Sequence, residues 1–323
     1  MKALQEQAER LTLSSRAFYN DRFPLFAEYL TSMLGYDMVL PMNTGAEAVE
    51  TALKLARKWG YEKKKIPKNE AIIVSCCGCF HGRTLAVISM SCDNDATRGF
   101  GPLLPGHLKV DFGDAVGLEK IFEEYGDRIA GFLFEPIQGE AGVIIPPDGY
   151  LKSVRELCSK YNILMIADEI QSGLARSGKM LACDWEEVRP DVVVLGKALG
   201  GGVIPVSAVL SDKDVMLCIQ PGEHGSTFGG NPLASAVAVA SLDVIRDERL
   251  SERYYICSVM FFSIEITENK SWKVTNEVFA EIFYFWPCIL SGSGELKYGE
   301  CIIYLYNQNL LLKLTERFWH ANL

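Results

Sequence analysis

Residues 191–202 read DVVVLGKALGGG, a run of apolar residues followed by a lysine and a glycine-rich loop. A segment that is apolar at every position predicts a strand buried on both faces of a sheet, here over 191–197. The lysine at its end has two interpretations, a solvated turn or a chemical role beside glycines that let a bound molecule approach the backbone. Other segments of the sequence are needed to choose between these two interpretations.

The segments on either side repeat this pattern. Short apolar runs predict further strands over 71–77, 129–136, 162–169 and 206–211, and amphipathic segments predict helices over 43–60, 117–126, 150–161 and 232–248. Asn43 or Thr44 is the expected N-cap of the first of these helices. The alternation predicts an α/β fold over 43–253, in which helices cover both faces of a mostly parallel sheet.

Composition limits the classes of partner. The chain has 323 residues and a formal net charge of -9, so a nucleic-acid partner, which favours a basic surface, is not expected. No apolar stretch is long enough for a membrane span, and the nearest, 278–290, contains Glu281 and Pro287. Residues 1–42 are expected to form an N-terminal helical segment without the apolar region of a signal peptide. Residues 254–323 are rich in aromatic side chains and lose the periodicity, which predicts an atypical C-terminal segment.

Three functional side chains come at the ends of predicted strands, namely Glu135, Asp168 and Lys197. The carboxyl ends of parallel strands meet at one edge of a sheet, where ligands bind, so we expect these side chains on one rim. Burial of the lysine would favour the free amine that imine formation needs. The Thr-Gly turn that opens the helix after Asn43 offers free N–H groups to a phosphate.

Each of these features has an ordinary structural explanation when it is taken alone, as a capped helix start, a loop aspartate or a surface lysine. Together they supply a phosphate-binding site, a carboxylate for a pyridinium nitrogen and an amine that can form an imine. Pyridoxal 5'-phosphate (PLP) requires this set of groups, so the sequence favours a PLP site.

Two other patterns suggest different ligands. GLARSGKM (173–180) matches the first seven positions of a nucleotide-binding P-loop, but Met180 replaces the Ser or Thr that would bind magnesium. CCGCFH (76–81) has the C-x-x-C spacing of a zinc site, but no second pair follows at zinc-finger spacing. Strand cysteines are the favoured interpretation, and no metal site is predicted.

Six segments resemble one known family. They are MNTGAEAVETALKLARKW (42–59), FHGRT (80–84), FEPIQGEAGV (134–143), LMIADEIQSGLARSGK (164–179), VVLGKALGGGVIPVSAV (193–209) and GEHGSTFGGNP (222–232). They are similar to segments of the class III PLP-dependent aminotransferases, particularly the ornithine aminotransferases of plants. The resemblance runs from about residue 5 to about residue 252, and it implies the large domain of a fold-type I PLP-dependent transferase.

The resemblance also assigns roles to residues. Lys197 and Asp168 would be catalytic, Lys197 by joining PLP through an imine and moving a proton, and Asp168 by holding the pyridine nitrogen protonated. The implied cofactor-binding set is Gly45 and Ala46 at the phosphate, Phe80 on the ring face, Gln171 at the phenolic oxygen, Thr227 from the neighbouring subunit, and again Asp168 and Lys197. Arg83 would bind a substrate carboxylate, and Glu140 would pair with an arginine of the C-terminal domain.

The implied reaction transfers the δ-amino group of L-ornithine to 2-oxoglutarate, giving glutamate and glutamate 5-semialdehyde, between arginine breakdown and proline synthesis. The family's sites imply a homodimer, and its eukaryotic members imply the mitochondrial matrix. No import signal is evident, which leaves the cytoplasm as the alternative compartment. The alternative functions are an aminotransferase for acetylornithine or 4-aminobutyrate, and an inactive isoform that dimerises with full-length subunits.

The chain departs from the family at both ends. Family members begin well before the first residue of this chain, and the match stops after about residue 252. Residues 254–323 hold a single arginine, Arg317, which stands in no matching context. We therefore expect a truncated chain with an intact cofactor site and an incomplete substrate site, and the alternative is a divergent small domain.

Overall fold

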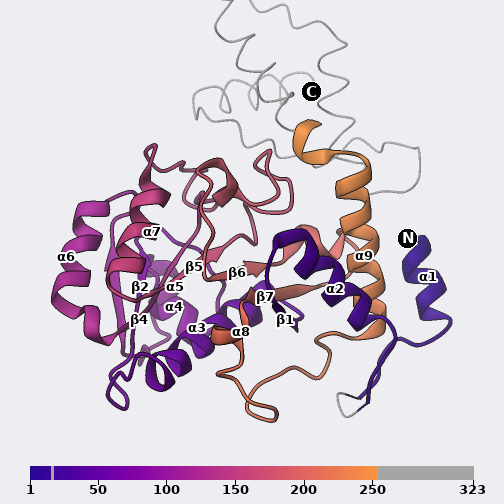
Figure 1. Ribbon diagram of the computed structural model, residues 1–323, viewed down its shortest axis with the longest axis horizontal. Helices are drawn as coiled ribbons and strands as arrows, with labels where there is room; N and C mark the ends of the chain where they lie inside the picture. Colours follow the sequence, from indigo (N-terminus) through magenta and orange to yellow (C-terminus); the bar gives the residue numbers. More distant parts are fainter. Residues whose placement is uncertain (16–17, 254–323) are drawn as a thin grey trace, which may run out of the picture.

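In the computed structural model, which describes residues 1–15 and 18–253, the central feature is a mixed sheet of seven strands (Figure 1). The strands are β1 (Met38–Met42), β2 (Ile72–Cys76), β3 (His107–Val110), β4 (Ile129–Phe134), β5 (Leu164–Asp168), β6 (Val192–Leu195) and β7 (Ser207–Ser211). Their order across the sheet is β1-β7-β6-β5-β4-β2-β3. The five strands from β3 to β6 in this order are parallel, while β7 is antiparallel to both β6 and β1.

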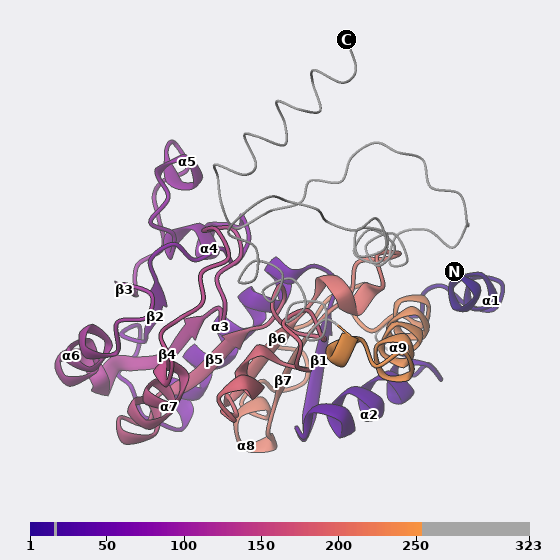
Figure 2. The ribbon, with the colours of Figure 1, turned by 90° about the horizontal axis from the view of Figure 1, so that it is seen from above.

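Helices cover both faces of this sheet (Figures 1 and 2). The α-helices are α1 (Lys2–Ala8), α2 (Phe23–Leu34), α3 (Gly45–Glu62), α4 (Leu85–Ser89), α5 (Asn94–Thr97), α6 (Ala115–Tyr125), α7 (Tyr150–Lys160), α8 (Lys213–Met216) and α9 (Pro232–Asp247). Three short 3-10 helices are η1 (Gly126–Arg128), η2 (Ala182–Trp185) and η3 (Lys197–Gly200). Helix α3 packs across one face with the core around it, and α6 and α7 share the other face with α2 and α9. The predicted α/β fold is confirmed.

The two-sided burial explains why the central strands are apolar at every position. In β6, Val192 and Val194 point into the core beneath α3, and Val193 and Leu195 point into the core beneath α2 and α9. Each of these side chains is fully buried, as is every residue of β4. Side chains that alternate between two apolar cores leave no position for a polar residue, so the strand loses the alternating pattern of a half-exposed sheet.

Helix α3 shows the same agreement between sequence and packing. Thr44 rather than Asn43 is its N-cap. Its core-facing side chains are fully buried at Ala48, Ala52, Leu55 and Ala56. Near its C-terminal end, Gly60 lies so close to the sheet that a Cβ there would stand 2.9 Å from the Cβ of Ala130 in β4. The helix therefore approaches the sheet at a distance that a larger residue at position 60 would prevent.

Some elements differ from the sequence predictions. The N-terminal segment 1–42 contains α1 and α2, but it ends in a strand, because β1 gains its hydrogen bonds from β7, far away in sequence. Edge strand β3 is four residues long and carries too little pattern to be recognised. The strand expected over 191–197 stops at Leu195, since the backbone of Gly196 leaves strand geometry and Lys197 begins η3. Residues 254–323 lie outside the described residues, and the three-segment division of the chain stays a prediction.

Candidate active site

The three side chains predicted for one rim lie at one edge of the sheet. Asp168 is the last residue of β5, Glu135 directly follows β4, and Lys197 follows β6 after one glycine. These strands are adjacent and parallel, so their carboxyl ends meet at this edge. Asp168 and Glu135 are buried, and the charge of Asp168 helps to raise the pKa of Glu135. The three residues thus meet at the edge where the carboxyl ends of the parallel strands lie, and ligand binding there stays a prediction.

A buried histidine that sequence reasoning did not assign to this site holds Asp168. Nδ1 of His81 lies 2.6 Å from Oδ2 of Asp168, and both side chains are almost completely inaccessible to solvent. The second carboxylate oxygen of Asp168 accepts a hydrogen bond from the backbone N–H of Ile170 at 3.1 Å. Burial by itself would lower the pKa of His81, but hydrogen bonds with Asp168 and Cys79 and the charge of the carboxylate outweigh it. The pKa of His81 therefore lies well above its ordinary value.

Glu135 completes this buried cluster. Its Oε2 accepts a hydrogen bond from the backbone N–H of Phe80 at 3.0 Å, which ties the end of β4 to the segment that follows β2. Burial raises the pKa of Glu135 to about 7, with the charge of His81 and the N–H of Phe80 opposing the rise and the charge of Asp168 adding to it. The cluster thus contains a carboxyl group that can gain or lose its proton near neutral pH, beside a paired imidazolium and carboxylate.

The side chain of Lys197 is exposed, and its position is set by the conformation of the backbone around it. The expectation that burial would desolvate this lysine is wrong for the described chain, because the residue lies beyond the strand end in η3. Its φ is 40°, a left-handed conformation that costs energy for a residue with a Cβ. The turn is stabilised by the N–H of Leu199, which donates to the carbonyl of Gly196, and by the hydroxyl of Ser241, which donates to the carbonyl of Ala198 at 2.8 Å.

The N-terminus of α3 reaches the same edge. Oγ1 of Thr44 accepts from the N–H of Glu47, and the carboxylate of Glu47 accepts from the N–H groups of Asn43 and Thr44 at 2.9 Å each, which forms a capping box. The N–H groups of Gly45 and Ala46 in the first turn have no acceptor within the helix, and their predicted contact with a phosphate stays a prediction.

Packing between the loops joins this helix start to the lysine. A Cβ at Gly45 would lie 2.9 Å from Cδ1 of Ile170, and one at Gly196 would lie 3.3 Å from Cγ2 of the same side chain. The hydroxyl of Ser207 in β7 donates to the carbonyl of Thr44 at 2.7 Å. The start of α3, the loop after Asp168 and the turn that carries Lys197 therefore share one packed junction.

Contacts link some of the remaining predicted residues to one another. The guanidinium of Arg83 lies 5.2 Å from the ring centroid of Phe80, on the segment that also carries His81. Nε2 of Gln171 lies 3.5 Å from Oε1 of Glu140, at the outer limit of a hydrogen bond. Thr227 is exposed, as is the side chain of Arg83. The ligand contacts assigned to these residues stay predictions.

The alternative ligand patterns gain no support from the geometry. Residues 173–180 form a turn closed by the N–H of Leu174 and the carbonyl of Met180, and no helix begins there to hold phosphates. Within residues 1–15 and 18–253, no three His, Cys, Asp or Glu side chains gather as a metal site would require. In the same residues, no helix is long and apolar enough to cross a membrane.

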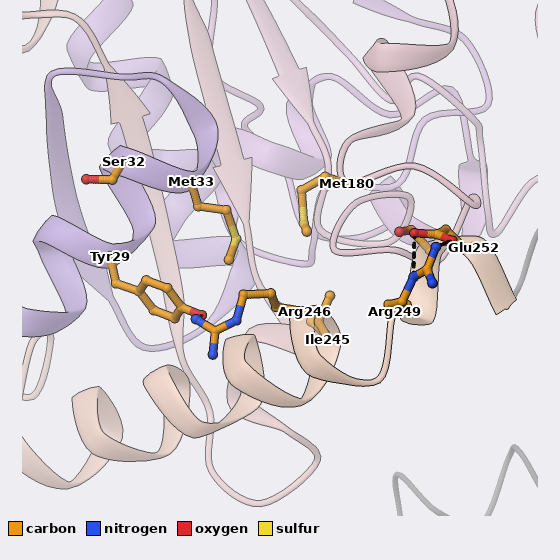
Figure 3. Close-up of a pocket in the computed structure, with 9 residues that line it drawn as sticks. Tyr29, Ser32, Met33, Met180, Ile245, Arg246, Arg249 and Glu252 are labelled. Atoms are coloured by element: carbon orange, nitrogen blue, oxygen red, sulfur yellow. Dashed lines mark hydrogen bonds and ion pairs between the residues drawn. The ribbon is translucent and has the colours of Figure 1, made fainter.

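A separate pocket lies between α2 and α9 (Figure 3). Tyr29 and Met33 line it from α2, and Arg246 lines it from α9. The hydroxyl of Tyr29 accepts a hydrogen bond from Arg246 at 2.5 Å and donates one to Asp243. None of the residues predicted for catalysis or cofactor binding lines this pocket, so it does not enlarge the candidate site.

The family of the chain follows from its residues as well as from its fold. Residues 1–268 match the profile of the family described as Aminotransferase class-III, and the chain belongs to this family. It is 87% identical over 253 residues to the mitochondrial ornithine aminotransferase of Arabidopsis thaliana, an alignment that covers 78% of this chain and 53% of that protein. The chain thus spans about half the length of the curated relative that it matches.

Solved structures of related proteins support the same family. The ornithine aminotransferase of Toxoplasma gondii, which has PLP at partial occupancy in its active site, is 50% identical with a TM-score of 0.79, over 80% of this chain and 61% of that one. An acetylornithine aminotransferase of Elizabethkingia anophelis is 51% identical with a TM-score of 0.72, over 81% of this chain and 62% of that one. The resemblance drawn from the sequence and the fold-type I architecture are confirmed.

Proposed function

We propose that this chain is the cofactor-binding part of an ornithine aminotransferase, which transfers the δ-amino group of L-ornithine to 2-oxoglutarate with PLP as cofactor. The observation that carries the proposal is the buried His81–Asp168 pair at the sheet edge that also presents Lys197. The 87% identity to the Arabidopsis ornithine aminotransferase supports the choice of substrate.

The groups at this edge fit PLP chemically. The N–H groups at the start of α3 suit the phosphate, since they carry the positive end of the helix dipole. Asp168 has lone pairs left on both oxygens after its two hydrogen bonds, and it suits a protonated pyridine nitrogen. Lys197 supplies the primary amine that binds an aldehyde. Phosphate, pyridinium and aldehyde are the three groups that PLP presents to a protein.

When it is bound, PLP supplies an electron sink for the negative charge that forms on a substrate carbon. The side chains of the protein then have two tasks, to transfer one proton of the substrate and to stabilise the positive charge on the pyridine nitrogen. The amine of Lys197, at Nζ, would take the proton from the substrate carbon that bears the transferred amino group and would deliver it to the cofactor. Asp168 holds a positive charge on the pyridine nitrogen, and His81 fixes the orientation of Asp168 from within the core.

Substrate binding and assembly belong to the same proposal. Arg83 is exposed beside Phe80 and suits a substrate carboxylate. Glu140 lies next to Gln171, where a cationic group of substrate or protein would balance its charge. The exposed Thr227 suits a contact with the phosphate site of a second copy in a homodimer. A mitochondrial location is included because the Arabidopsis relative bears that name.

Covalent attachment of PLP tests the cofactor assignment. The full chain is incubated with PLP, treated with sodium borohydride to fix any imine, and weighed by mass spectrometry. We expect the added mass of PLP on the wild-type chain and on a Lys213→Ala control, whose change removes an exposed lysine of α8. The variant Lys197→Ala should gain no such mass. Equal labelling of wild type and Lys197→Ala would contradict the assignment.

The amine donor is tested by half-reactions. The PLP-loaded chain is mixed with L-ornithine, acetylornithine or 4-aminobutyrate in the absence of 2-oxoglutarate, and loss of the cofactor's visible absorbance is followed. The proposal expects L-ornithine to react fastest. A faster reaction with acetylornithine would favour the function named for the Elizabethkingia relative.

A further inference from the structure

Two cysteines outside the proposed cofactor-binding set lie side by side just beyond β2. Cys77 directly follows this strand, and Cys92 follows α4 and is fifteen positions later. The thiol of Cys92 donates to Sγ of Cys77 across 2.9 Å. Cys92 is exposed, whereas Cys77 is half-buried. A reagent in solution can therefore reach one sulfur, and the second sulfur stands next to it.

The backbone on each side of this pair is held in place. The N–H of Cys77 donates to the carbonyl of Val110 at 2.8 Å, and the side-chain amide of Gln138 donates to the carbonyl of Cys77 at 2.9 Å. Nζ of Lys109 donates to the carbonyl of Ser91, the neighbour of Cys92. A disulfide bond of about 2.05 Å requires the two sulfur atoms to approach by only roughly 0.9 Å, which side-chain rotation supplies.

The neighbouring cysteines have other contacts. Cys76 is buried in β2, and its Sγ lies 4.0 Å from the hydroxyl of Tyr150. Sγ of Cys79 points to the carbonyl of Met90 at 3.7 Å. Of the cysteines clustered near this strand end, Cys77 is thus the one that contacts Cys92.

We propose that Cys77 and Cys92 form a reversible disulfide bond when the chain meets a low-molecular-weight disulfide such as oxidised glutathione. The Cys92 thiolate attacks one sulfur of oxidised glutathione, and the first glutathione leaves as a thiolate that takes up the proton lost by Cys92. The sulfur of Cys77 then attacks Sγ of Cys92, and the second glutathione leaves with the proton of Cys77. Both cysteines are oxidised, and one glutathione disulfide is reduced to two thiols.

The order of attack follows from the surroundings of the two thiols. Burial raises the pKa of Cys77 to about 12, helped by the hydrogen bond and the charge of Cys92 and by Asp111. Cys92 is exposed and meets the reagent first. The bond would join the segment 77–81, which carries Phe80 and His81, to the loop after α4. This modification does not depend on the proposed aminotransferase activity.

The sequence makes the bond easy to detect. Trypsin releases residues 69–83, with Cys76, Cys77 and Cys79, and separately residues 84–98, with Cys92 as their single cysteine. The full chain is reduced, exchanged into oxidised glutathione, alkylated and digested without reductant. We expect the two peptides to be joined, with a mass about 2 Da below their sum because two hydrogens are lost, and to separate after dithiothreitol.

Serine variants identify the partners. Cys77→Ser and Cys92→Ser should each abolish the joined peptide, and Cys79→Ser, a matched change two positions away in the same peptide, should retain it. Circular dichroism checks that each variant is folded, and the exposed Cys92 tolerates serine even if the half-buried Cys77 does not. Joined peptides that persist in Cys77→Ser, or a wild-type Cys92 that ends only as a glutathione adduct, would overturn the proposal.

Discussion

Glu135 makes the stability of the folded chain depend on pH in a window set by its buried position. The side chain is 2% exposed, and its pKa is about 7 in the folded chain against an ordinary value of 4.5. Between these values the folded chain keeps a proton that the unfolded chain has released. The free energy of unfolding therefore falls as pH rises through this window, and it is constant on either side as far as this group is concerned.

The shift sets the size of the effect. A difference of roughly 2.5 pH units at about 1.4 kcal/mol each gives an upper limit of roughly 3–4 kcal/mol lost as pH rises through the range from 4.5 to 7. The variant Glu135→Gln keeps the shape of the side chain and an oxygen that accepts from the N–H of Phe80, but it cannot titrate. We expect the variant to lose about 3 kcal/mol less than the wild type over this window.

Urea unfolding at pH 5 and pH 8, followed by tryptophan fluorescence, measures the difference. The variant Glu156→Gln provides a matched control, because it makes the same change on an exposed side chain of α7. Its pH dependence should equal that of the wild type. If Glu135→Gln also loses as much stability as the wild type between the two pH values, Glu135 is ionised throughout and the reasoning from burial is refuted.

Two further predictions concern packing. The change His81→Leu leaves the carboxylate of Asp168 buried without its cation, so it should lower the free energy of unfolding in urea by about 3–5 kcal/mol. The control change His107→Leu, at a half-buried position, should lower it much less. Equal losses in the two variants would contradict the role of the pair. The change Gly60→Ala should lower the free energy of unfolding by about 1–3 kcal/mol despite the better helix propensity of alanine, since the new Cβ meets Ala130 at 2.9 Å. A raised thermal midpoint for Gly60→Ala would show that α3 can move away from the sheet.

The sequence by itself determined the central strands of the sheet and the edge at which the candidate site lies. The strands β4, β5 and β6 are apolar at every position because both of their faces are covered, and this pattern is local and strong. The sequence also predicts that Asp168, Glu135 and Lys197 lie at this edge, because each comes where one of those strands ends. The N-cap of α3 was narrowed to two adjacent residues by the preference of capping positions for short polar side chains.

Tertiary structure alone decided the features that depend on contacts between distant segments. His81 comes shortly after the end of a predicted strand, so its position in the sequence already indicates the edge that carries the candidate site. Only the fold brings its ring against Asp168, which comes 87 positions later. Strand β1 exists because β7 supplies its hydrogen bonds, and the exposure of Lys197 depends on how η3 leaves the sheet. Local patterns record which side chains must be buried, whereas the partner of each buried polar group is set by the fold, because that choice involves residues that no short window contains.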